Sequence, residues 1–259
     1  MRAKSVLQHL VLTFLFFSFP LFSQTNDEGH GPKRVSGSIG YSSLGSFAEI
    51  QFRPAYHDLL NTDKGFVPNS ETQVMNGAVR YYEGSRKLEL TRLNVIRMYS
   101  LNPYNSISES KTYALDLGAE TVTVKTKHQP FWKDKEEYSR ITPVNAEASY
   151  GYSFQNEFSR EDSPFLFTVM AGVKAQAHGY FKNEARIAPQ GVLNFLYNIG
   201  SWKIQTYYAY HYYNISQNEN DYTANLRLRY AIQKNHEVRF EFSKHTYYQD
   251  VSFSYHYLF

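Results

Sequence analysis

The sequence predicts an all-β fold, namely a transmembrane antiparallel β-barrel of about twelve strands that follows a cleaved signal peptide. Three observations carry this prediction. Apolar and polar residues alternate almost everywhere after Arg34, aromatic residues are abundant, and the chain begins with a short basic and apolar segment. The 259 residues include 23 Tyr and 19 Phe but no Cys. The absence of cysteine from the chain excludes disulfides, thiolate metal ligands and a cysteine nucleophile.

The first residues have the order of a secretory signal. Arg2 and Lys4 precede an apolar run at residues 10–22, and the small residue Ser23 follows it. The run is too short for a comfortable transmembrane helix, and this pattern is typical of a segment that is removed after export. We therefore predict a signal peptide at residues 1–23, a flexible lead-in at 24–33 and an outer-membrane β-barrel at 34–259.

The alternation defines about twelve strands of period two. Their predicted spans are 34–43, 47–59, 71–84, 86–99, 111–124, 143–158, 165–181, 190–199, 201–214, 221–233, 236–246 and 249–259. Strands of a soluble β-sandwich, the alternative fold, average about 5–6 residues, whereas strands that cross a bilayer need roughly 9–11. The length of these segments and the aromatic residues near their ends favour the membrane barrel.

Two places break the alternation. In the 86–99 segment Leu88 and Leu90 lie in one phase and Leu93 and Val95 in the other, which predicts a β-bulge near Arg92. Pro54 lies inside another predicted strand, where it lacks an amide hydrogen for the ladder. It therefore predicts a bulge or a strand end.

The last segment, VSFSYHYLF, predicts how the barrel closes. Val251 and Phe253 begin a face of apolar side chains, and polar residues occupy the other face. In lipid every backbone polar group needs an internal partner, so this strand is expected to pair with the first one. A final aromatic strand resembles the signal that bacterial outer-membrane barrels present to the barrel assembly machinery. The residues assigned to this assembly signal are Phe253, Tyr255, Tyr257 and Phe259.

A family resemblance is densest in the first third of the barrel. Its matching pieces are FRPAYHDLL from Phe52, GFVP from Gly65, RYY from Arg80 and LELTRLNVIRMYSLNP from Leu88. They resemble the carboxyl-terminal barrel region of bacterial surface proteins of unknown function. Those proteins carry a periplasmic, cysteine-peptidase-like domain of the Lnb amino-terminal type ahead of the barrel. Here the barrel follows the predicted signal directly, so the activity of that domain does not carry over.

Charged residues of both signs recur on the face that would line the lumen. The cluster Arg53, His57 and Asp58 admits an acid–base role, but mutual pairing inside a filled barrel is the favoured interpretation, since charges out of water need partners. The predicted lumen network comprises Glu49, Arg53, His57, Arg80, Asp116, Glu147, Arg227, Arg229, Arg239 and Glu241. Such a filled lumen predicts little steady conductance.

Enzymatic designs find little support in the sequence. A phospholipase-type site needs Ser and His together on the lipid face, and no such pair is predicted. A rim hydrolase would use His178, His245 and Asp250, which lie near strand ends. No catalytic, phosphate-binding or metal motif is present. We therefore predict no catalytic residue, no metal and no cofactor.

The leading functional prediction is a structural anchor or docking platform for a periplasmic or surface partner. The alternatives are a small-solute channel and a rim hydrolase. With both chain ends in the periplasm, NTDKGFVPNS and SLNPYNSISES become unusually long periplasmic connections. They supply the candidate docking residues Asp63, Phe66, Pro68 and Asn105. The longest outer loop carries Phe131 and Trp132. The expected partners are outer-membrane lipid, the assembly machinery and a periplasmic protein. The formal net charge of +3, close to neutral once Arg2 and Lys4 are removed, favours no nucleic acid.

Overall fold

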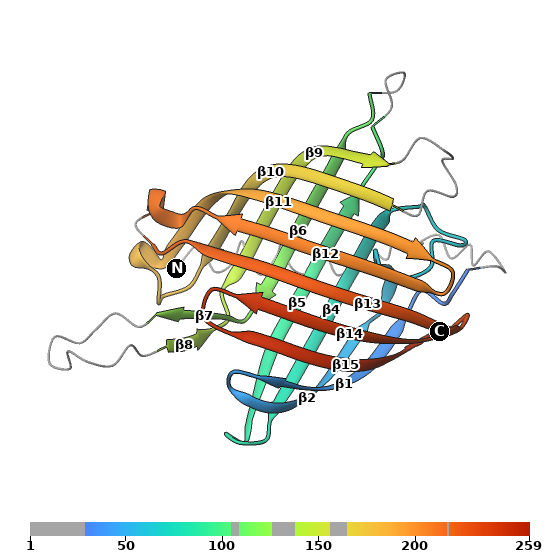
Figure 1. Ribbon diagram of the computed structural model, residues 1–259. Helices are drawn as coiled ribbons and strands as arrows, with labels where there is room; N and C mark the ends of the chain where they lie inside the picture. The colour runs from blue at the N-terminus through green and yellow to red at the C-terminus, as the bar shows by residue number, and fades with distance from the viewer. Residues whose placement is uncertain (1–28, 105–108, 126–137, 156–164, 217) are drawn as a thin grey trace, which may run out of the picture.

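The computed structural model describes residues 29–104, 109–125, 138–155, 165–216 and 218–259 (Figure 1). Most of them lie in strands. The strands are β1 (Arg34–Ser42), β2 (Gly45–Arg53), β3 (Ala55–His57), β4 (Ser70–Tyr82), β5 (Lys87–Ser100), β6 (Thr112–Glu120), β7 (Val122–Lys125), β8 (Tyr138–Ile141), β9 (Val144–Gln155), β10 (Phe165–Ala177), β11 (Ala185–Ile199), β12 (Trp202–His211), β13 (Asp221–Gln233), β14 (His236–His245) and β15 (Gln249–Leu258). Two short 3₁₀ helices, η1 (Lys182–Glu184) and η2 (Tyr213–Ser216), lie in connections.

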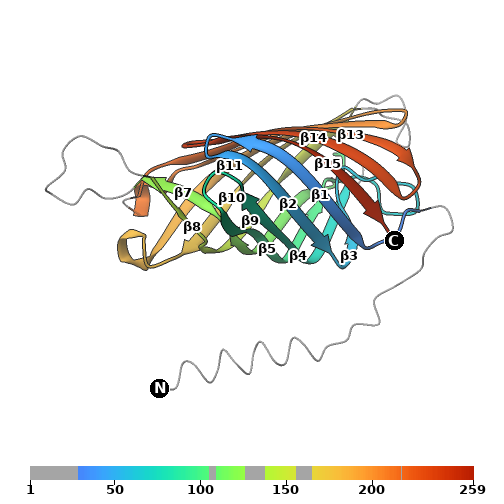
Figure 2. The same ribbon diagram turned by 90° about the horizontal axis from the view of Figure 1, so that it is seen from below.

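The strands form a closed antiparallel barrel. Strands adjacent in the sequence pair with each other, except that β2 pairs with β4 and β6 with β9, and the sheet closes where β1 pairs with β15. The strand β2 pairs with β4 and continues into β3 beyond Pro54. Likewise β7 continues β6, and β8 leads into β9, so that the barrel has 12 strands. The tilted strands enclose one lumen, which Figure 2 shows from a perpendicular direction. The predicted fold class is therefore confirmed.

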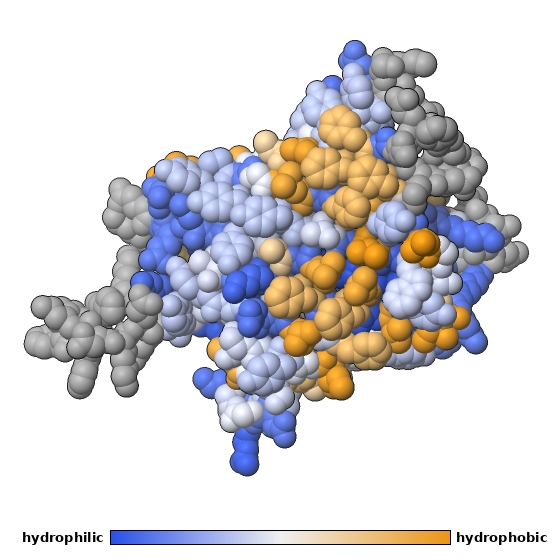
Figure 3. All heavy atoms as spheres, viewed as in Figure 1, coloured by the Kyte–Doolittle hydropathy of each residue, from blue (hydrophilic) through white to orange (hydrophobic). Residues whose placement is uncertain are grey.

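The two faces of the wall differ sharply. Outward side chains such as Ile39, Ile50, Leu193 and Phe253 are exposed to the surroundings. Figure 3 shows apolar residues gathered in a band across the wall, with polar residues towards both ends. Inward side chains are mostly polar or charged, and most of these are buried. This distribution, apolar outside and polar inside, is the inverse of a water-soluble domain and fits a barrel in a bilayer.

The outward aromatic residues flank this band. Tyr41, Tyr81, Trp202, Tyr212 and Tyr257 are all exposed and lie near strand ends. Amphipathic rings at these levels are typical of the interfacial girdles of membrane barrels. Among the described residues, no helix is long and apolar enough to span a membrane.

The irregular positions of the sequence have structural counterparts. The β4–β5 register shifts between Ala78 and Val79, where Thr91 is skipped on the facing strand, which confirms the bulge predicted beside Arg92. At Pro54 the strand is interrupted, and the ladder resumes at Ala55. The strand predicted to reach residue 59 instead ends at His57. Conversely, β11 begins at Ala185, earlier than the predicted residue 190.

Both described chain ends lie at one end of the barrel, which we call the terminal end. There Lys33 and Phe259 exchange two backbone hydrogen bonds of 3.0 Å. The same end carries the connections β3–β4 and β5–β6. The other rim, called the opposite end, carries the β1–β2 turn and the β7–β8 hairpin.

Candidate functional site: a polar chamber closed by an inner turn

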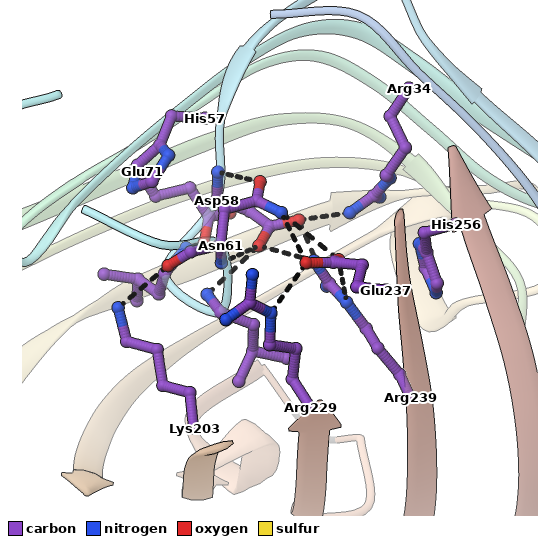
Figure 4. A network of polar contacts seen from close by, with 12 residues as sticks. Arg34, His57, Asp58, Asn61, Glu71, Lys203, Arg229, Glu237, Arg239 and His256 are labelled. Atoms are coloured by element: carbon purple, nitrogen blue, oxygen red, sulfur yellow. Dashed lines mark hydrogen bonds and ion pairs between the residues drawn. The ribbon is translucent and has the colours of Figure 1, made fainter. Parts of the chain in front are cut away.

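The connection from β3 to β4 folds into the lumen at the terminal end. Its first four residues, Asp58, Leu59, Leu60 and Asn61, are each at most 4% exposed. We call Asp58–Asn61 the inner turn (Figure 4). The turn fixes its own shape, because the Asp58 carboxylate accepts the backbone N–H groups of Leu60 and Asn61 at 3.0 Å. In return the Asn61 side-chain oxygen accepts the backbone N–H of Asp58 at 3.1 Å.

Arginines from three strands surround the Asp58 carboxylate. Arg239 of β14 binds it with two hydrogen bonds of 3.1 and 3.0 Å. Arg53 of β2 donates to Oδ2 at 3.1 Å, and Arg34 of β1 contacts the same oxygen. Burial alone would raise the pKa of the Asp58 carboxyl, but the guanidinium groups of Arg239, Arg34 and Arg53 hold it well below its usual range. The ionised carboxylate of Asp58 therefore holds the turn in place through its contacts with these three arginines.

Asn61 fastens the other end of the inner turn. Its amide donates to the Glu237 carboxylate at 3.2 Å, and Glu237 also binds Arg229 at 2.7 Å. The backbone carbonyl of Asn61 accepts the ammonium of Lys203 at 3.1 Å. These contacts reach β12, β13 and β14, across the lumen from the strand that leads into the turn. The inner turn thus bridges the barrel wall from several sides.

Apolar packing fills the rest of the lumen at this level. Leu59 belongs to a cluster contributed by the strands β5, β6, β10, β11 and β12 and by the residue after β5. Its other members are Tyr99, Leu101, Ala114, Leu166, Met170, Val192, Leu196 and Ala209, with Tyr207 packed against it. One side of the turn is therefore charged and the other apolar, and together they close the terminal end of the lumen.

A chain of polar contacts links the N-terminal segment to the loop beyond the inner turn. His30 and His57 approach at 3.0 Å through ring nitrogens, and His57 contacts Asp63 at 3.3 Å. Asp63 also accepts the ammonium of Lys203 at 2.9 Å. Phe66 stacks on both imidazole rings at centroid distances of 4.5 Å. These contacts hold the N-terminal segment at His30 against the loop that contains Asp63 and Phe66.

Two titratable groups in these terminal-end segments have shifted pKa values. Burial lowers the pKa of His30 to about 4, because the charged imidazolium is poorly solvated there. Burial would raise the pKa of Asp63, but the hydrogen bond from His57 and the charge of Lys203 outweigh it and lower this pKa to about 2. At neutral pH the segment therefore holds a neutral His30 and an ionised Asp63.

Two polar cavities occupy the lumen beyond the inner turn. One of about 90 Å³ lies against the turn and is lined by Arg34, Asp58, Leu60 and Arg239, among others. The second, of about 130 Å³, reaches the opposite end at Arg140 and Tyr248. The cavities share the lining residues Glu49, Gln51, Arg92, Arg227, Glu241 and Ser252. Together they form one polar chamber, which extends from the inner turn to the opposite rim. We call it the chamber.

The predicted lumen residues take up inward positions with charged or polar partners. Arg80 binds Glu49 at 2.9 Å and Asp250 at 2.7 Å. Arg227 binds Glu241 at 2.9 Å. Asp116 lies 3.5 Å from Arg97, and Glu147 lies 3.6 Å from Lys174. Arg53, Arg229 and Arg239 join the inner-turn cluster, and His57 joins the aromatic stack.

Sequence reasoning missed several residues of this cluster. Arg34, Lys203 and Glu237 lie on the inward phase of their strands, so the alternation could have identified them as lumen residues. Asn61 gave no such signal, because it follows the last residue of β3 and has no periodic context. Its position depends on partners far away in the sequence.

The candidate docking residues divide between the interior and the surface. Asp63 and Phe66 turn towards the mouth of the barrel and make the contacts described above, whereas Pro68 and its neighbour Val67 are exposed. Asn105 lies outside the described residues, as do Phe131 and Trp132. In the assembly segment, Phe253, Tyr255, Tyr257 and Phe259 are exposed on the outer face.

The proposed rim-hydrolase residues do not form a relay. His245 contacts Thr223 at 3.2 Å and stacks on Tyr248, while Asp250 binds Arg80. His178 packs near Phe181 at a different connection. Within the described part of the chain, no hydrogen bond or ion pair joins any two of His178, His245 and Asp250. No group of potential metal ligands is found among these residues either.

The closed sheet, the outward apolar band and the polar lumen define a β-barrel of the bacterial outer membrane. Within that class, the chain belongs to a family described as a domain of unknown function (DUF7840), whose model matches residues 23–257. No curated protein matches the sequence significantly.

Several solved structures are similar to this chain at low identity. The KdgM porin in complex with disordered oligogalacturonate is 11% identical, with a TM-score of 0.44, and covers 87% of this chain and 99% of its own. Omp33 of Acinetobacter baumannii is 9% identical, with a TM-score of 0.38 and coverages of 89% and 99%. The β domain of the Bordetella autotransporter BrkA is 14% identical, with a TM-score of 0.36 and coverages of 90% and 100%. At these values the likeness concerns the general fold alone.

Proposed function

We propose that the protein is a small-solute channel that rests in a closed state. The observation that carries this proposal is the chamber itself, which runs from the opposite rim to the inner turn and stops there. We assign the terminal end to the periplasm, as is usual for barrels of even strand number. A polar solute would then enter from outside, and conduction would require the inner turn to leave the lumen.

The resting state is expected to be firmly closed. Asp58 is held by three guanidinium groups and Asn61 by Glu237 and Lys203, so opening breaks several charge-assisted contacts in a region of low dielectric constant. Spontaneous opening is therefore rare. The proposal thus retains the low steady conductance that the sequence predicts.

Planar-bilayer recordings of variants test this proposal. The native barrel is expected to show little steady conductance, whereas a variant with a short Gly–Asn turn in place of residues 58–69 is expected to give stable single-channel steps. As a matched control, Lys64→Ala combined with Val67→Ala alters the same loop but leaves the inner turn in place, and it should stay closed. A shortened-loop barrel that is folded and still silent would contradict the channel.

A second candidate function is docking of a periplasmic partner. It is favoured by the exposed apex of the same loop, where Val67 is 66% exposed although Asp63 and Phe66 are fastened beside it. A fixed shape lowers the entropic cost of binding. The resemblance to barrels that follow a periplasmic domain implies a contact on this side, which would suit a docking role.

In-cell crosslinking separates the two functions. A photocrosslinker at Val67 is expected to capture a periplasmic protein, whereas one at Leu44, which is also exposed but lies in the β1–β2 turn at the opposite end, is not. Capture at Leu44 alone would place the contact surface on the outside and contradict periplasmic docking.

A further inference from the structure

The charges beside the inner turn do not balance. Four guanidinium groups, from Arg34, Arg53, Arg229 and Arg239, contact only two carboxylates, those of Asp58 and Glu237. The nearby Lys203–Asp63 pair is neutral as a unit and does not change this difference. Glu71, which accepts the backbone N–H of Leu59, and Asp116 share the single guanidinium of Arg97 and so offset one of the two remaining charges. One positive charge therefore remains uncompensated in a buried region, where an unpaired charge is costly.

Unused hydrogen-bond capacity lies within the same cluster. Arg34 is 3% exposed and His256 is 4% exposed, and both line the cavity against the turn. Among the described residues, Nε of Arg34 and Nδ1 of His256 have no hydrogen-bond partner, although buried polar atoms normally find one. In Figure 4 both side chains lie beside the Asp58–Arg239 pair.

The wall at this place leaves room for a ligand. Small serines at alternate positions, Ser36 and Ser38 of β1 and Ser252 and Ser254 of β15, line the same cavity of about 90 Å³. They add hydroxyl groups without filling the space. The site thus combines excess positive charge, an unpaired N–H donor of Arg34, a His256 ring nitrogen that can donate in one of its two tautomers, and an open volume, which is chemistry that suits an oxyanion.

We propose that this part of the chamber is a binding site for a small oxyanion, a carboxylate or a phosphate group, held between Arg34, His256 and the serine wall. The bound anion compensates the excess positive charge that the Asp58 and Glu237 carboxylates leave. It lies next to the Asp58–Arg239 pair and shares the same cluster of guanidinium groups. The inference deepens the channel proposal by naming a solute class, and its test is binding alone. A native barrel that binds an oxyanion, together with a folded shortened-loop variant that stays silent in planar bilayers, would uphold the site and refute the channel.

The test is the thermal unfolding midpoint of the full-length, detergent-folded barrel in acetate or in phosphate, each compared with chloride at equal ionic strength. A ligand that binds only the folded state raises the midpoint, by about 5 °C at roughly 100 times its Kd. A rise in acetate alone indicates a carboxylate, a rise in phosphate alone a phosphate, and a rise in both an unselective oxyanion site.

Three variants locate the effect. Arg34→Gln removes a charge and a donor of the site, and Ser38→Leu fills the cavity without changing charge. Neither variant is expected to show the rise of the unfolding midpoint in acetate or phosphate. Arg140→Gln makes the same charge change at the opposite end, where Arg140 pairs with Glu89, and is expected to keep it. If Arg34→Gln fails to fold, the unfolding midpoint of Ser38→Leu decides whether the rise depends on this site. The proposal is overturned if the native barrel shows no rise in either anion, or if the folded variants of the site keep it.

Discussion

At the scale of single residues, the lumen is organised by carboxylates that serve several partners at once. Glu237 is fully buried and accepts hydrogen bonds from Arg229, Arg239 and Asn61. Glu241 lies four residues further along β14, but its side chain is 36% exposed and pairs with Arg227. The same side-chain type therefore has two very different environments on one strand.

This difference predicts unequal effects of one substitution. Glu237→Gln keeps the shape but leaves two buried arginines short of a counter-charge, so it is expected to destabilise the folded barrel by about 3–5 kcal/mol. Glu241→Gln, the matched control, is expected to cost less than about 1 kcal/mol because water in the chamber screens that pair. Urea titration of the heat-modifiable folded band measures both. Equal shifts of the two midpoints would argue against a structural role for the inner-turn cluster.

The N-terminal segment carries a second residue-scale prediction. His30 has a folded-state pKa of about 4, below its ordinary 6.5, so the unfolded segment binds a proton that the folded segment excludes. Its stability is therefore full above pH 6.5 and declines as the pH falls towards 4, by roughly 3 kcal/mol in total. Hydrogen exchange of residues 29–33, corrected for intrinsic rates, should quicken from pH 7 to pH 5. In His30→Phe, which keeps an aromatic ring beside Phe66, this dependence should weaken; an unchanged dependence would assign it to another group.

At the scale of elements, the strands follow the sequence because a period of two requires only local information. The bulge at Thr91, which is skipped in the β4–β5 register, is visible in the sequence as a change of alternation phase between Leu90 and Leu93. The inner turn is different. Leu59 and Leu60 look like the end of a strand, and the prediction therefore extended that strand through residue 59. What takes them out of the wall is the Asp58 side chain, which closes a turn, and partners such as Arg239 and Lys203 that only the folded barrel brings near.

The same contrast explains what the sequence reveals about the site. The inward phase identified Glu49, Arg80 and Arg227 as lumen residues. It gave no pairing scheme, since partners across a barrel depend on strand order and register. The chamber and its closed end were likewise out of reach, because both follow from the position of a connection rather than from any strand.

At the scale of the whole molecule, closure joins the two ends of the described chain. Besides the β1–β15 ladder, the segment before β1 runs along Phe259, and a Cβ added to Gly31 would lie 2.4 Å from Phe259 backbone atoms. Gly37 lies on β1 itself, yet a Cβ there meets nothing within 4 Å. Gly31 is thus required for a close backbone approach and Gly37 is not.

Valine substitutions at these two glycines are therefore expected to differ in their effect on barrel assembly. Gly31→Val should lower the yield of heat-modifiable barrel, and deletion of Phe259 should do the same because it removes both hydrogen bonds to Lys33. Gly37→Val, the matched control, adds an apolar side chain to the outer face and should assemble normally. The measurement is the folded fraction in isolated outer membranes. Normal levels of the Gly31 and Phe259 variants would show that assembly tolerates an imperfect seam.

The inner turn also has a consequence for the order of folding events. Its side-chain contacts come from Arg34 near one end of the described chain and from Lys203 and Arg239 near the other. The turn therefore cannot make these contacts until the final strands have joined the barrel. Contacts between such distant segments form late. A newly closed barrel should therefore pass through a short-lived, leakier intermediate before the lumen seals. In pulsed thiol labelling, protection of Leu60→Cys is expected to lag behind protection of a cysteine in the β1–β15 seam, and simultaneous protection would mean that the turn is carried in with its own hairpin.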